Sequence, residues 1–304
     1  MRFKILFSIA VHEKMDVVLD MLKNIQHYAP DSAVVLHVAS DFQEEFSRYS
    51  LTDYTNVFTN PESLITGFSD QTLFFVHYAN LLFAESTGIQ FDKWSMFASN
   101  QLFVREGVEC YLDKFDSSTY TEKLDFDIHR YRFLQDNVTK AAVDSFGFEM
   151  RKVPPEGTFY SRADILIMLS NKKLHTFFLD NLKYFVTPKL AQKRVWLNKR
   201  GKKLIRAKFG LAVRIFPNIF KRFIYASEEL IFPTVLGRSN KRIGEIYCFL
   251  NWSNNLEVTK ADVDKVASGC LPGVYAVKRV DRVLDDPLRV YIRESFQDHV
   301  DSSL

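Results

Sequence analysis

The sequence is short of cysteine and lacks the signatures of several large enzyme classes. It has three cysteines in 304 residues, Cys110, Cys248 and Cys270, an odd number at wide spacing. Such cysteines favour neither a disulfide framework nor a Cys-x-x-Cys metal site, so a reducing, cytoplasmic setting is expected. The patterns GxGxxG, GxxxxGK(S/T), HExxH and GxSxG are all absent. The sequence therefore indicates no phosphate-cradling glycine loop, zinc-peptidase helix or serine-hydrolase turn.

Long apolar runs are absent as well. A transmembrane helix needs about 18 or more consecutive apolar residues, and no such run occurs. The N-terminal segment MRFKILFSIAVHEK is interrupted by Ser8, stops at His12 and has no small-residue cleavage site after it. This pattern favours a buried first strand over a signal peptide, and a soluble or peripheral protein is expected.

Acidic residues are missing from one long stretch. No Asp or Glu lies between Asp180 and the adjacent pair Glu228 and Glu229, in FKRFIYASEELIFPTVLG. Between Pro188 and Arg222 there are twelve lysines and arginines, although the net charge of the whole chain is only +3. The rest of the chain is therefore net acidic, and the basic tract is its strongest compositional signal.

The basic tract also carries an apolar stripe. Apolar residues recur from Ile205 to Phe223 at spacings of 4 and 3, which predicts a helix face that Pro217 must kink or divide. Because cationic amphipathic helices lie in anionic membrane interfaces, residues 188–224 are interpreted as an inserted, membrane-associating segment. The alternative is a helix packed on the core with a solvated basic face. Nucleic-acid binding is disfavoured, since the tract joins no nucleic-acid motif.

The first hundred residues alternate between strand and helix patterns. The hydrophobic fraction of 47%, with 28 Phe and 13 Tyr, suits a substantial core, and residues 1–304 are expected to form one domain. Alternation predicts an α/β fold with a mostly parallel sheet covered by helices on both faces. Strands are expected at 3–11, 32–39 and 55–60, helices from 16 and at 70–86, a strand and loop at 94–104, and a strand leading into a helix at 156–171.

Polar residues follow several of the expected strands. Ligands of such sheets bind beyond the carboxyl ends of the strands. This places His12, Ser40 with Asp41, and residues 99–101 at the candidate site, although a single polar residue there is more often part of an ordinary loop. The acid pair Glu228 and Glu229 fits the first turn of a helix, where carboxylates favour the positive end of the dipole.

Two short acidic patterns are candidate metal sites. A metal-dependent sugar-nucleotide site needs paired carboxylates after a central strand. DFD at 125–127 lies in a polar stretch, and DVD at 262–264 is typical of a helix start. Neither pattern predicts a metal site, and no metal or other cofactor is expected.

Several segments, taken in order, resemble one family. The family is the core-2/I-branching β-1,6-N-acetylglucosaminyltransferases, which group with the peptide xylosyltransferases. The matching segments run from about residue 3 to 285, with the basic tract as an insertion: SIAVHEK (8–14), VVLHVASD (34–41), NVFTNPESLITGFSDQ (56–71), WSMFASNQLFV (94–104), EGTFYSRADILIML (156–169), ASEELIFPTVL (226–236) and VYAVKRVD (274–281). The resemblance implies a GT-A glycosyltransferase fold with a Rossmann-like central sheet, in a bacterial-type member.

The resemblance also implies roles for individual residues. Glu229 matches the family's catalytic base, and Lys278 matches the lysine that binds the donor diphosphate. Trp252 falls near an aromatic residue that stacks on the acceptor sugar, and Glu228 and Asn100 are expected to bind the acceptor. The nucleotide sugar is expected to contact Val11, His12, Ala39, Asp41, Thr66 and Gly67.

The chain departs from the family's pattern at three places. The aspartate of the family's HVD strand end is replaced by Ala39, with Asp41 two positions later, and the tyrosine near Thr66 is absent. The family's second diphosphate-binding residue, an arginine, has no clear counterpart, so Lys260 or Arg242 is a candidate substitute. These changes leave the donor open. The family's disulfides and Golgi anchor are also missing, as in a cytoplasmic relative.

The expected activity is an inverting, metal-independent sugar transfer. One carboxylate takes the proton of the acceptor hydroxyl, and a lysine stabilises the departing diphosphate. We expect a hexosyl-, N-acetylhexosaminyl- or pentosyltransferase that uses a UDP-linked donor and a saccharide or lipid-linked acceptor. It would build cell-surface polysaccharide at the inner face of the cell membrane. The alternative is a catalytically silent GT-A-like component of an assembly complex that binds membrane or glycan.

Overall fold

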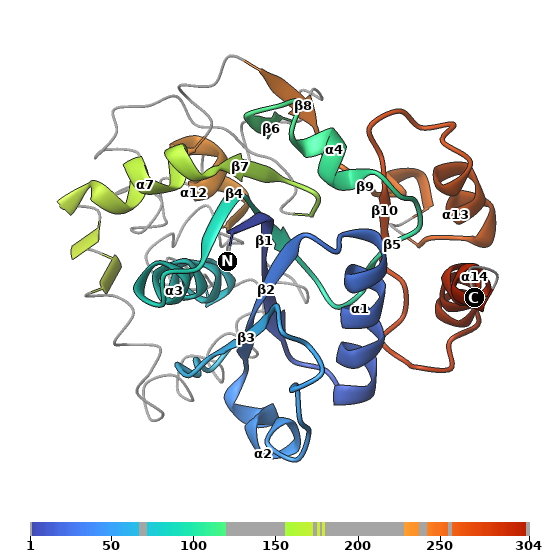
Figure 1. Ribbon diagram of the computed structural model, residues 1–304, viewed down its shortest axis with the longest axis horizontal. Coiled ribbons are helices and arrows are strands. Elements are labelled where there is room, and N and C mark those ends of the chain that lie inside the picture. The colour runs from blue at the N-terminus through green and yellow to red at the C-terminus, as the bar shows by residue number, and fades with distance from the viewer. Residues whose placement is uncertain are drawn as a thin grey trace, which may run out of the picture.

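The computed structural model describes residues 2–66, 72–119, 156–172, 175–176, 178–179, 228–236, 242–254 and 257–301 (Figure 1). The basic segment 188–224, Gly67 and the DFD stretch at 125–127 lie outside the described residues. In the described ranges, no helix is both long enough and apolar enough to cross a lipid bilayer.

The core of the fold is a seven-stranded sheet with the order β3-β2-β1-β4-β7-β6-β8. Four neighbouring strands are parallel: β3 (Val57–Asn60), β2 (Ser32–Val38), β1 (Arg2–Val11) and β4 (Gln90–Phe97). The other three extend the sheet beyond β4: β7 (Phe159–Ser161), β6 (Ser117–Thr119) and β8 (Ile243–Glu245). Because β7 is antiparallel to both β4 and β6, the sheet is mixed but largely parallel. The expected α/β fold with a mostly parallel sheet is confirmed, and the sheet is compatible with a Rossmann-like fold.

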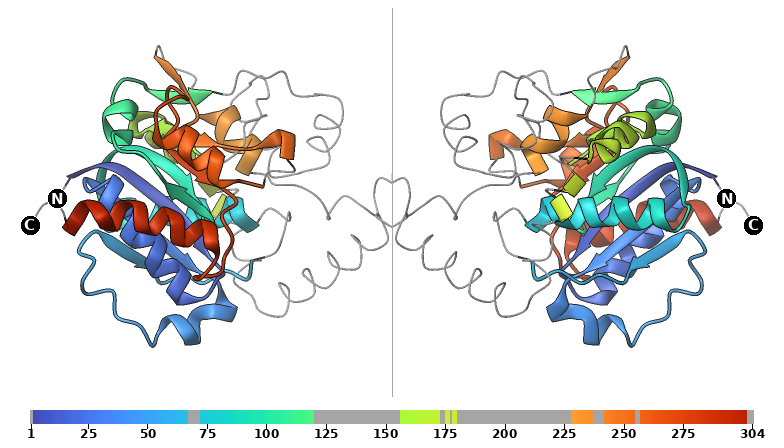
Figure 2. Two further views of the ribbon diagram at one scale, coloured as in Figure 1. Left: turned by 90° about the vertical axis from the view of Figure 1, so that its right-hand side faces the viewer. Right: turned by 90° about the vertical axis from the view of Figure 1, so that its left-hand side faces the viewer.

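Helices cover both faces of the central sheet, as Figure 2 shows from its two sides. One face carries α1 (Met15–Tyr28) and α14 (Pro287–Asp301), and the other carries α3 (Thr72–Ser86), α7 (Arg162–Ser170) and α12 (Glu228–Val235). The alternation of β1 explains both layers: Ile5, Phe7 and Ile9 pack with α1, whereas Leu6 and Ala10 pack with α3. A strand buried on both faces reads as a continuous apolar run, as this one does.

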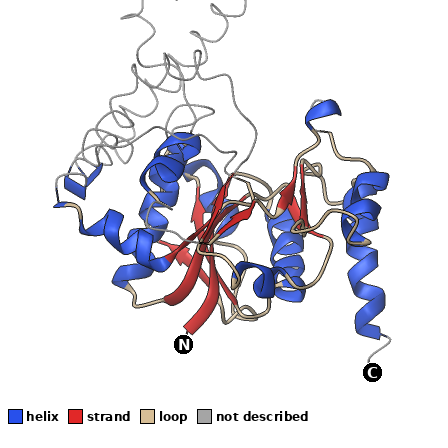
Figure 3. Ribbon diagram, turned by 90° about the horizontal axis from the view of Figure 1, so that it is seen from above, coloured by secondary structure: helices blue, strands red, loops and turns tan. Residues whose placement is uncertain are grey.

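A second, smaller sheet lies beside the first (Figure 3). Its order is β5-β10-β9, where β5 (Gln101–Phe103) is antiparallel and β9 (Cys248–Phe249) parallel to β10 (Ala276–Lys278). The sequence predicted a strand and a loop at 94–104. This was wrong in one respect, since the chain turns at Ala98–Asn100 and forms β5 in the second sheet. This turn brings β10, and with it Lys278, next to the end of β4.

Several helix starts follow from local hydrogen bonding. Ser161 caps α7, the helix expected within 156–171, by accepting a hydrogen bond from the Asp164 amide. At α13 (Lys260–Ala267), Thr259 and Asp262 form a capping box, so DVD lies at a helix start, as its sequence predicted. The described part of α12 runs from Glu228 to Val235, so the acid pair is helical, as predicted. Short helical turns complete the fold: η1 (Ser40–Phe42), α2 (Gln43–Phe46), α4 (Val108–Leu112) and η2 (Trp252–Asn254).

Two histidines are buried without charge between the sheet and α3. His77 Nδ1 lies 2.8 Å from Ser8 Oγ, which also accepts a hydrogen bond from Asn80 Nδ2 at 3.0 Å. His37 Nε2 accepts from the Leu64 amide at 2.8 Å. Burial lowers the pKa of His77 to about 3 and that of His37 to about 4. Both side chains are therefore neutral in the fold over the physiological range.

These histidines make the fold sensitive to mild acid. Their pKa values in the unfolded chain are near 6.5. Below pH 6.5 the unfolded state therefore binds more protons than the folded state does. Stability is fully present above about pH 6.5 and falls by about 1.4 kcal/mol per pH unit for each histidine as the pH decreases. We expect His77→Gln to halve the part of the slope of unfolding free energy against pH that His77 and His37 contribute. Urea unfolding of both proteins between pH 7 and 5 measures it, and equal slopes would contradict the assignment.

Candidate functional site

The carboxyl ends of three parallel strands meet at one edge of the central sheet. These ends are Val11 of β1, Val38 of β2 and Phe97 of β4. The first two loops are tied together, because the Ala39 amide donates to the Val11 carbonyl at 2.9 Å. The expected placement of the strand-end residues is confirmed, and this edge is where an α/β sheet presents its ligand site.

The second sheet adds a cationic element to this edge. Lys278 ends β10 opposite Gln101 of β5, and the chain that follows bonds to the neighbouring turn. The Asn100 carbonyl accepts hydrogen bonds from the amides of Arg279 and Val280, each at 3.1 Å. Arg279 has a φ of 83°, a left-handed conformation that costs a non-glycine residue about 1–2 kcal/mol. The tight turn after Lys278 is thus held against the end of β4.

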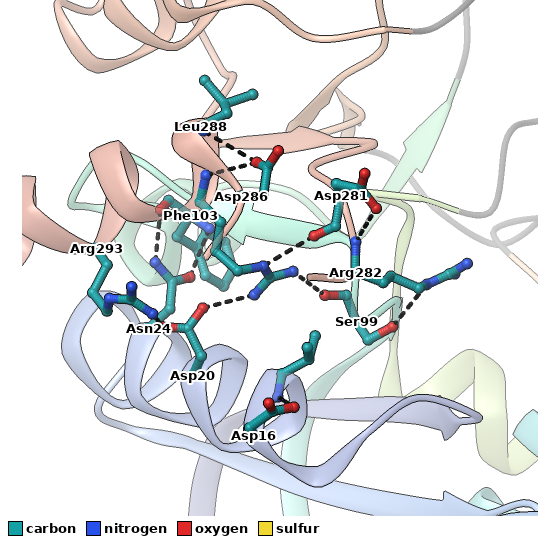
Figure 4. A network of polar contacts seen from close by, with 12 residues as sticks. Asp16, Asp20, Asn24, Ser99, Phe103, Asp281, Arg282, Asp286, Leu288 and Arg293 are labelled. Atoms are coloured by element: carbon teal, nitrogen blue, oxygen red, sulfur yellow. Dashed lines mark hydrogen bonds and ion pairs between the residues drawn. The ribbon is translucent and has the colours of Figure 1, made fainter. Parts of the chain in front are cut away.

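Arg282 enters the same edge from the loop between β10 and α14. Its Nε lies 2.6 Å from Glu13 Oε1 and donates to Ser99 Oγ at 3.3 Å. The side chain of Glu13 is only 4% exposed, whereas that of Arg282 is 40% exposed. No described residue accepts a hydrogen bond from the two terminal nitrogens of Arg282, which point away from the surrounding network in Figure 4. They form a donor pair suited to an anionic ligand.

His12 lies among these charges. Its Nε2 is 3.2 Å from Glu13 Oε1. Burial lowers the pKa of His12, and the cations Arg282 and Lys278 lower it further, against the opposing effect of the Glu13 carboxylate. The imidazole is therefore neutral at pH 7 and can offer a hydrogen bond without adding charge.

Lys278 is also paired with a carboxylate. It forms an ion pair with Glu156, and both side chains are largely buried, at 14% and 17% exposure. Burial raises the pKa of the neighbouring Cys248 thiol, and the charge of Glu156 adds to the rise while Lys278 opposes it. Both cations of the edge thus have an acidic partner, Glu156 for Lys278 and Glu13 for Arg282.

A buried oxygen, Asn100 Oδ1, belongs to the same edge. Asn100 Oδ1 is buried, and no described residue donates a hydrogen bond to it. A shallow hollow adjoins the edge on the side of β1 and α2, where the Met15 amide donates to Glu45 Oε1 at 3.0 Å. Its lining is apolar and acidic: Val11, Glu13, Met15, Phe42, Glu45 and Phe46. Sequence reasoning missed Phe42 and Phe46, whose spacing of four along a helical segment was the available signal.

The acid pair lies on the α3 side of the molecule. Glu228 is buried at 4% exposure and Glu229 is half-buried, both in the first turn of α12. This helix packs through Phe232, whose ring centre is 4.7 Å from that of Trp94 and 5.0 Å from that of Phe74. Lys278 instead belongs to the small sheet on the α1 side. The structure brings Lys278, His12 and Asn100 together, and the described ring contacts of α12 are made by Phe232 with Trp94 and Phe74.

Three other predicted residues lie in loops after strands. Asp41 is exposed in the first turn of η1, and Thr66 is half-buried downstream of β3. Trp252 is 55% exposed in η2, which follows β9. Its predicted role in stacking on an acceptor sugar stays a prediction.

The two candidate second cations, Arg242 and Lys260, both have contacts elsewhere. Arg242 is engaged with Asp116 at 2.7 Å, and Lys260 lies 4.1 Å over the ring of Tyr291. Neither residue has a described contact with Lys278, whereas Arg282 and Lys278 both act on the pKa of His12. Arg282 is therefore the residue that sequence reasoning missed. The sequence feature that could have identified Arg282 is the run KRVDR, which begins at Lys278 and contains three basic residues.

In the described part of the chain, no group of three or more His, Cys, Asp or Glu residues could hold a metal ion. Comparison of the sequence with family models and with curated proteins found no match. Fold and site define an α/β protein with a mixed, largely parallel sheet. Its carboxyl edge carries two carboxylate-paired cations around a neutral histidine.

Proposed function

We propose that the protein is an inverting, metal-independent glycosyltransferase with a GT-A fold. It moves a sugar from a nucleotide-sugar donor to a saccharide or lipid-linked acceptor. The family resemblance implies that the donor is UDP-linked. The product would belong to a cell-surface polysaccharide. The observation that carries the proposal is the meeting of Lys278 and Arg282 beside His12 at the carboxyl edge of the sheet.

The arrangement suits a departing diphosphate. Two fixed cations can stabilise the charge that develops on the leaving group without a metal ion. The acceptor oxygen attacks the anomeric carbon, and the bond from that carbon to the diphosphate oxygen breaks, with its electron pair leaving on the diphosphate. Glu229 takes the proton of the acceptor hydroxyl. Val11, Ala39, Asp41, Thr66 and Gly67 would hold the nucleotide sugar, and Trp252, Glu228 and Asn100 the acceptor.

A second function remains compatible with the same edge. The protein would be a catalytically silent GT-A-like component that binds glycan or membrane in an assembly complex. The observation that favours it is that both cations of the edge already have a carboxylate partner, Glu156 for Lys278 and Glu13 for Arg282, which suits binding without turnover. The two functions differ in donor turnover, which only the transferase shows.

Binding of a nucleoside diphosphate tests the cation pair. We expect UDP at about 100 times its dissociation constant to raise the melting temperature by about 5 °C, because a ligand that binds only the folded state stabilises it by mass action. Arg282→Ala and Lys278→Ala should each weaken binding by about tenfold or more, since each removes a charged contact. The matched controls are Arg242→Ala and Lys260→Ala. If these controls weaken binding and the first two variants do not, the cation assignment is wrong.

The membrane contact is proposed for residues 188–224. We expect the protein to float with vesicles that contain anionic lipid and to remain behind with neutral vesicles. Replacing Lys202, Lys203 and Arg206 by glutamine should weaken anionic binding by about 100-fold, at about 1 kcal/mol for each basic group. Flotation that is independent of lipid charge, or absent, would favour a helix packed on the core. No nucleic-acid partner is proposed.

A further inference from the structure

A fully buried arginine in the first turn of α14 holds three segments of the chain together. The side chain of Arg289 has 0% exposure, and its Nη1 donates to Asp20 Oδ2 of α1 at 2.7 Å. Its Nη2 donates to the Ser99 carbonyl, in the turn after β4, at 3.0 Å. Its Nε donates to the Asp281 carbonyl, in the loop after β10, at 3.0 Å (Figure 4). One guanidinium thus joins α1 to both loops that form the cationic edge.

Two of these bonds reach the immediate surroundings of Arg282. Asp281 precedes Arg282 in the chain, so the bond to its carbonyl fixes the peptide at which Arg282 begins. Ser99 is held from two sides, because Arg289 bonds its carbonyl and Arg282 Nε donates to its hydroxyl at 3.3 Å. These contacts close a ring of four residues: Arg289, Asp281, Arg282 and Ser99. Arg282 is the member of the ring that faces the site.

The sequence sets the direction of Arg289 through the start of its helix. Asp286 Oδ1 accepts hydrogen bonds from the amides of Leu288 at 3.1 Å and Arg289 at 3.0 Å. Pro287 occupies the first helical position, where its missing amide hydrogen does no harm. The Asp-Pro start therefore places Arg289 on the side of α14 that faces α1.

Stability alone is a weak reason for this arrangement. A buried ion pair is often no more stabilising than apolar side chains of similar size, because both charges lose their hydration. A lysine could balance the charge of Asp20 but lacks the planar fork that reaches two carbonyls at once. The three directed bonds instead specify where the two loops lie.

We propose that Arg289 is a positioning residue, which through Ser99 and Asp281 fixes the guanidinium of Arg282 beside His12 and Glu13. The two terminal nitrogens of Arg282 are then held toward an anionic ligand. That this ligand is the diphosphate of a sugar donor rests on the proposed function. The geometry itself can be tested without any ligand.

His12 reports the position of Arg282. The charged groups that act on it are Glu13, Arg282 and Lys278. If Arg282 leaves its place beside Glu13, His12 loses a nearby cation and faces a less compensated carboxylate, so its pKa must rise. The titration is read by NMR on the whole protein, with the His12 signal assigned from a His12→Gln spectrum.

Two variants disturb the ring in different ways. Asp20→Leu combined with Arg289→Met replaces both partners by apolar side chains, and Arg289→Lys keeps the charge but removes the fork. We expect the double variant to melt near the parent temperature and both variants to show a raised His12 pKa. An unchanged His12 pKa in either variant that folds would overturn the proposal. Loss of folding in both would overturn it too, because Arg289 would then be essential to the fold as a whole.

Arg293→Met is the matched control. Arg293 bonds the other oxygen of Asp20 at 3.1 Å but has no described bond to either loop, so the His12 pKa should stay at its parent value. An equal rise in this control would assign the effect to the contact between α1 and α14 and overturn the proposal. Because no nucleotide is used, failure here leaves the proposed function intact, and a lack of donor turnover leaves the positioning role intact.

Discussion

Glu229→Gln is expected to lower sugar transfer by about 10²–10⁴-fold while leaving the fold and donor binding in place. The substitution keeps the shape of the side chain but removes the carboxylate that would take the acceptor proton. Glu229 is half-buried at the start of α12, so the amide can be accommodated without repacking the apolar residues behind it. The measurement is release of nucleoside diphosphate in the presence of acceptor, with melting temperature as the check on folding.

The control for this variant is Glu257→Gln. Glu257 is exposed near the start of α13, and the same chemical change there should leave the rate within about twofold of the parent. Turnover by Glu229→Gln at the parent rate would remove Glu229 as the base. Loss of turnover in both variants would point to a general effect of lowering the negative charge.

Asp20→Ala is expected to destabilise the protein by about 3–5 kcal/mol, the largest stability effect that we expect of a single substitution. Asp20 is 6% exposed and is the acid partner of both Arg289, at 2.7 Å, and Arg293, at 3.1 Å. Removing it leaves the fully buried guanidinium of Arg289 without a countercharge. Urea unfolding at pH 7 measures the change in the free energy of unfolding.

Asp31→Ala is the comparison for that measurement. Asp31 lies 3.3 Å from Lys4 on the surface, with its side chain 61% exposed, so its loss should cost no more than about 1 kcal/mol. A loss for Asp20→Ala as small as this one would mean that Arg289 finds water or another acceptor. The ring around Arg282 would then be looser than its contacts indicate.

The layered fold was predictable because its signals are local. β1 is buried on both faces and reads as an unbroken apolar run, and α1 and α3 follow from their apolar residues. The helix start at DVD and the helix within 156–171 were predictable for the same reason, since the caps Thr259 and Ser161 bond within three residues. The strand β7 was expected within 156–171, but its antiparallel pairing and the second sheet were not predicted, because strand order depends on contacts between segments far apart in the chain.

The site was predictable only in part. Strand ends identified His12 and Asn100, and the family resemblance identified Lys278, because these depend on chain position. Arg282 was missed because its role comes from partners that are distant in sequence, Glu13 and Ser99. The sequence offered Arg242 and Lys260 instead, since charge alone does not show which cations are engaged elsewhere. The basic segment 188–224 and Gly67 lie outside the described residues, and their predicted roles stay predictions.

Donor turnover tests the central claim most directly. The protein is incubated in EDTA with a panel of sugar nucleotides, and the released nucleoside diphosphate is measured for the parent chain and for Glu229→Gln, Lys278→Ala and Arg282→Ala. We expect release from at least one donor by the parent, undiminished by EDTA, and strong loss in all three variants. If no donor in the panel is turned over although nucleoside diphosphate binds at Lys278 and Arg282, the protein is not a transferase, and the catalytically silent function replaces the proposal.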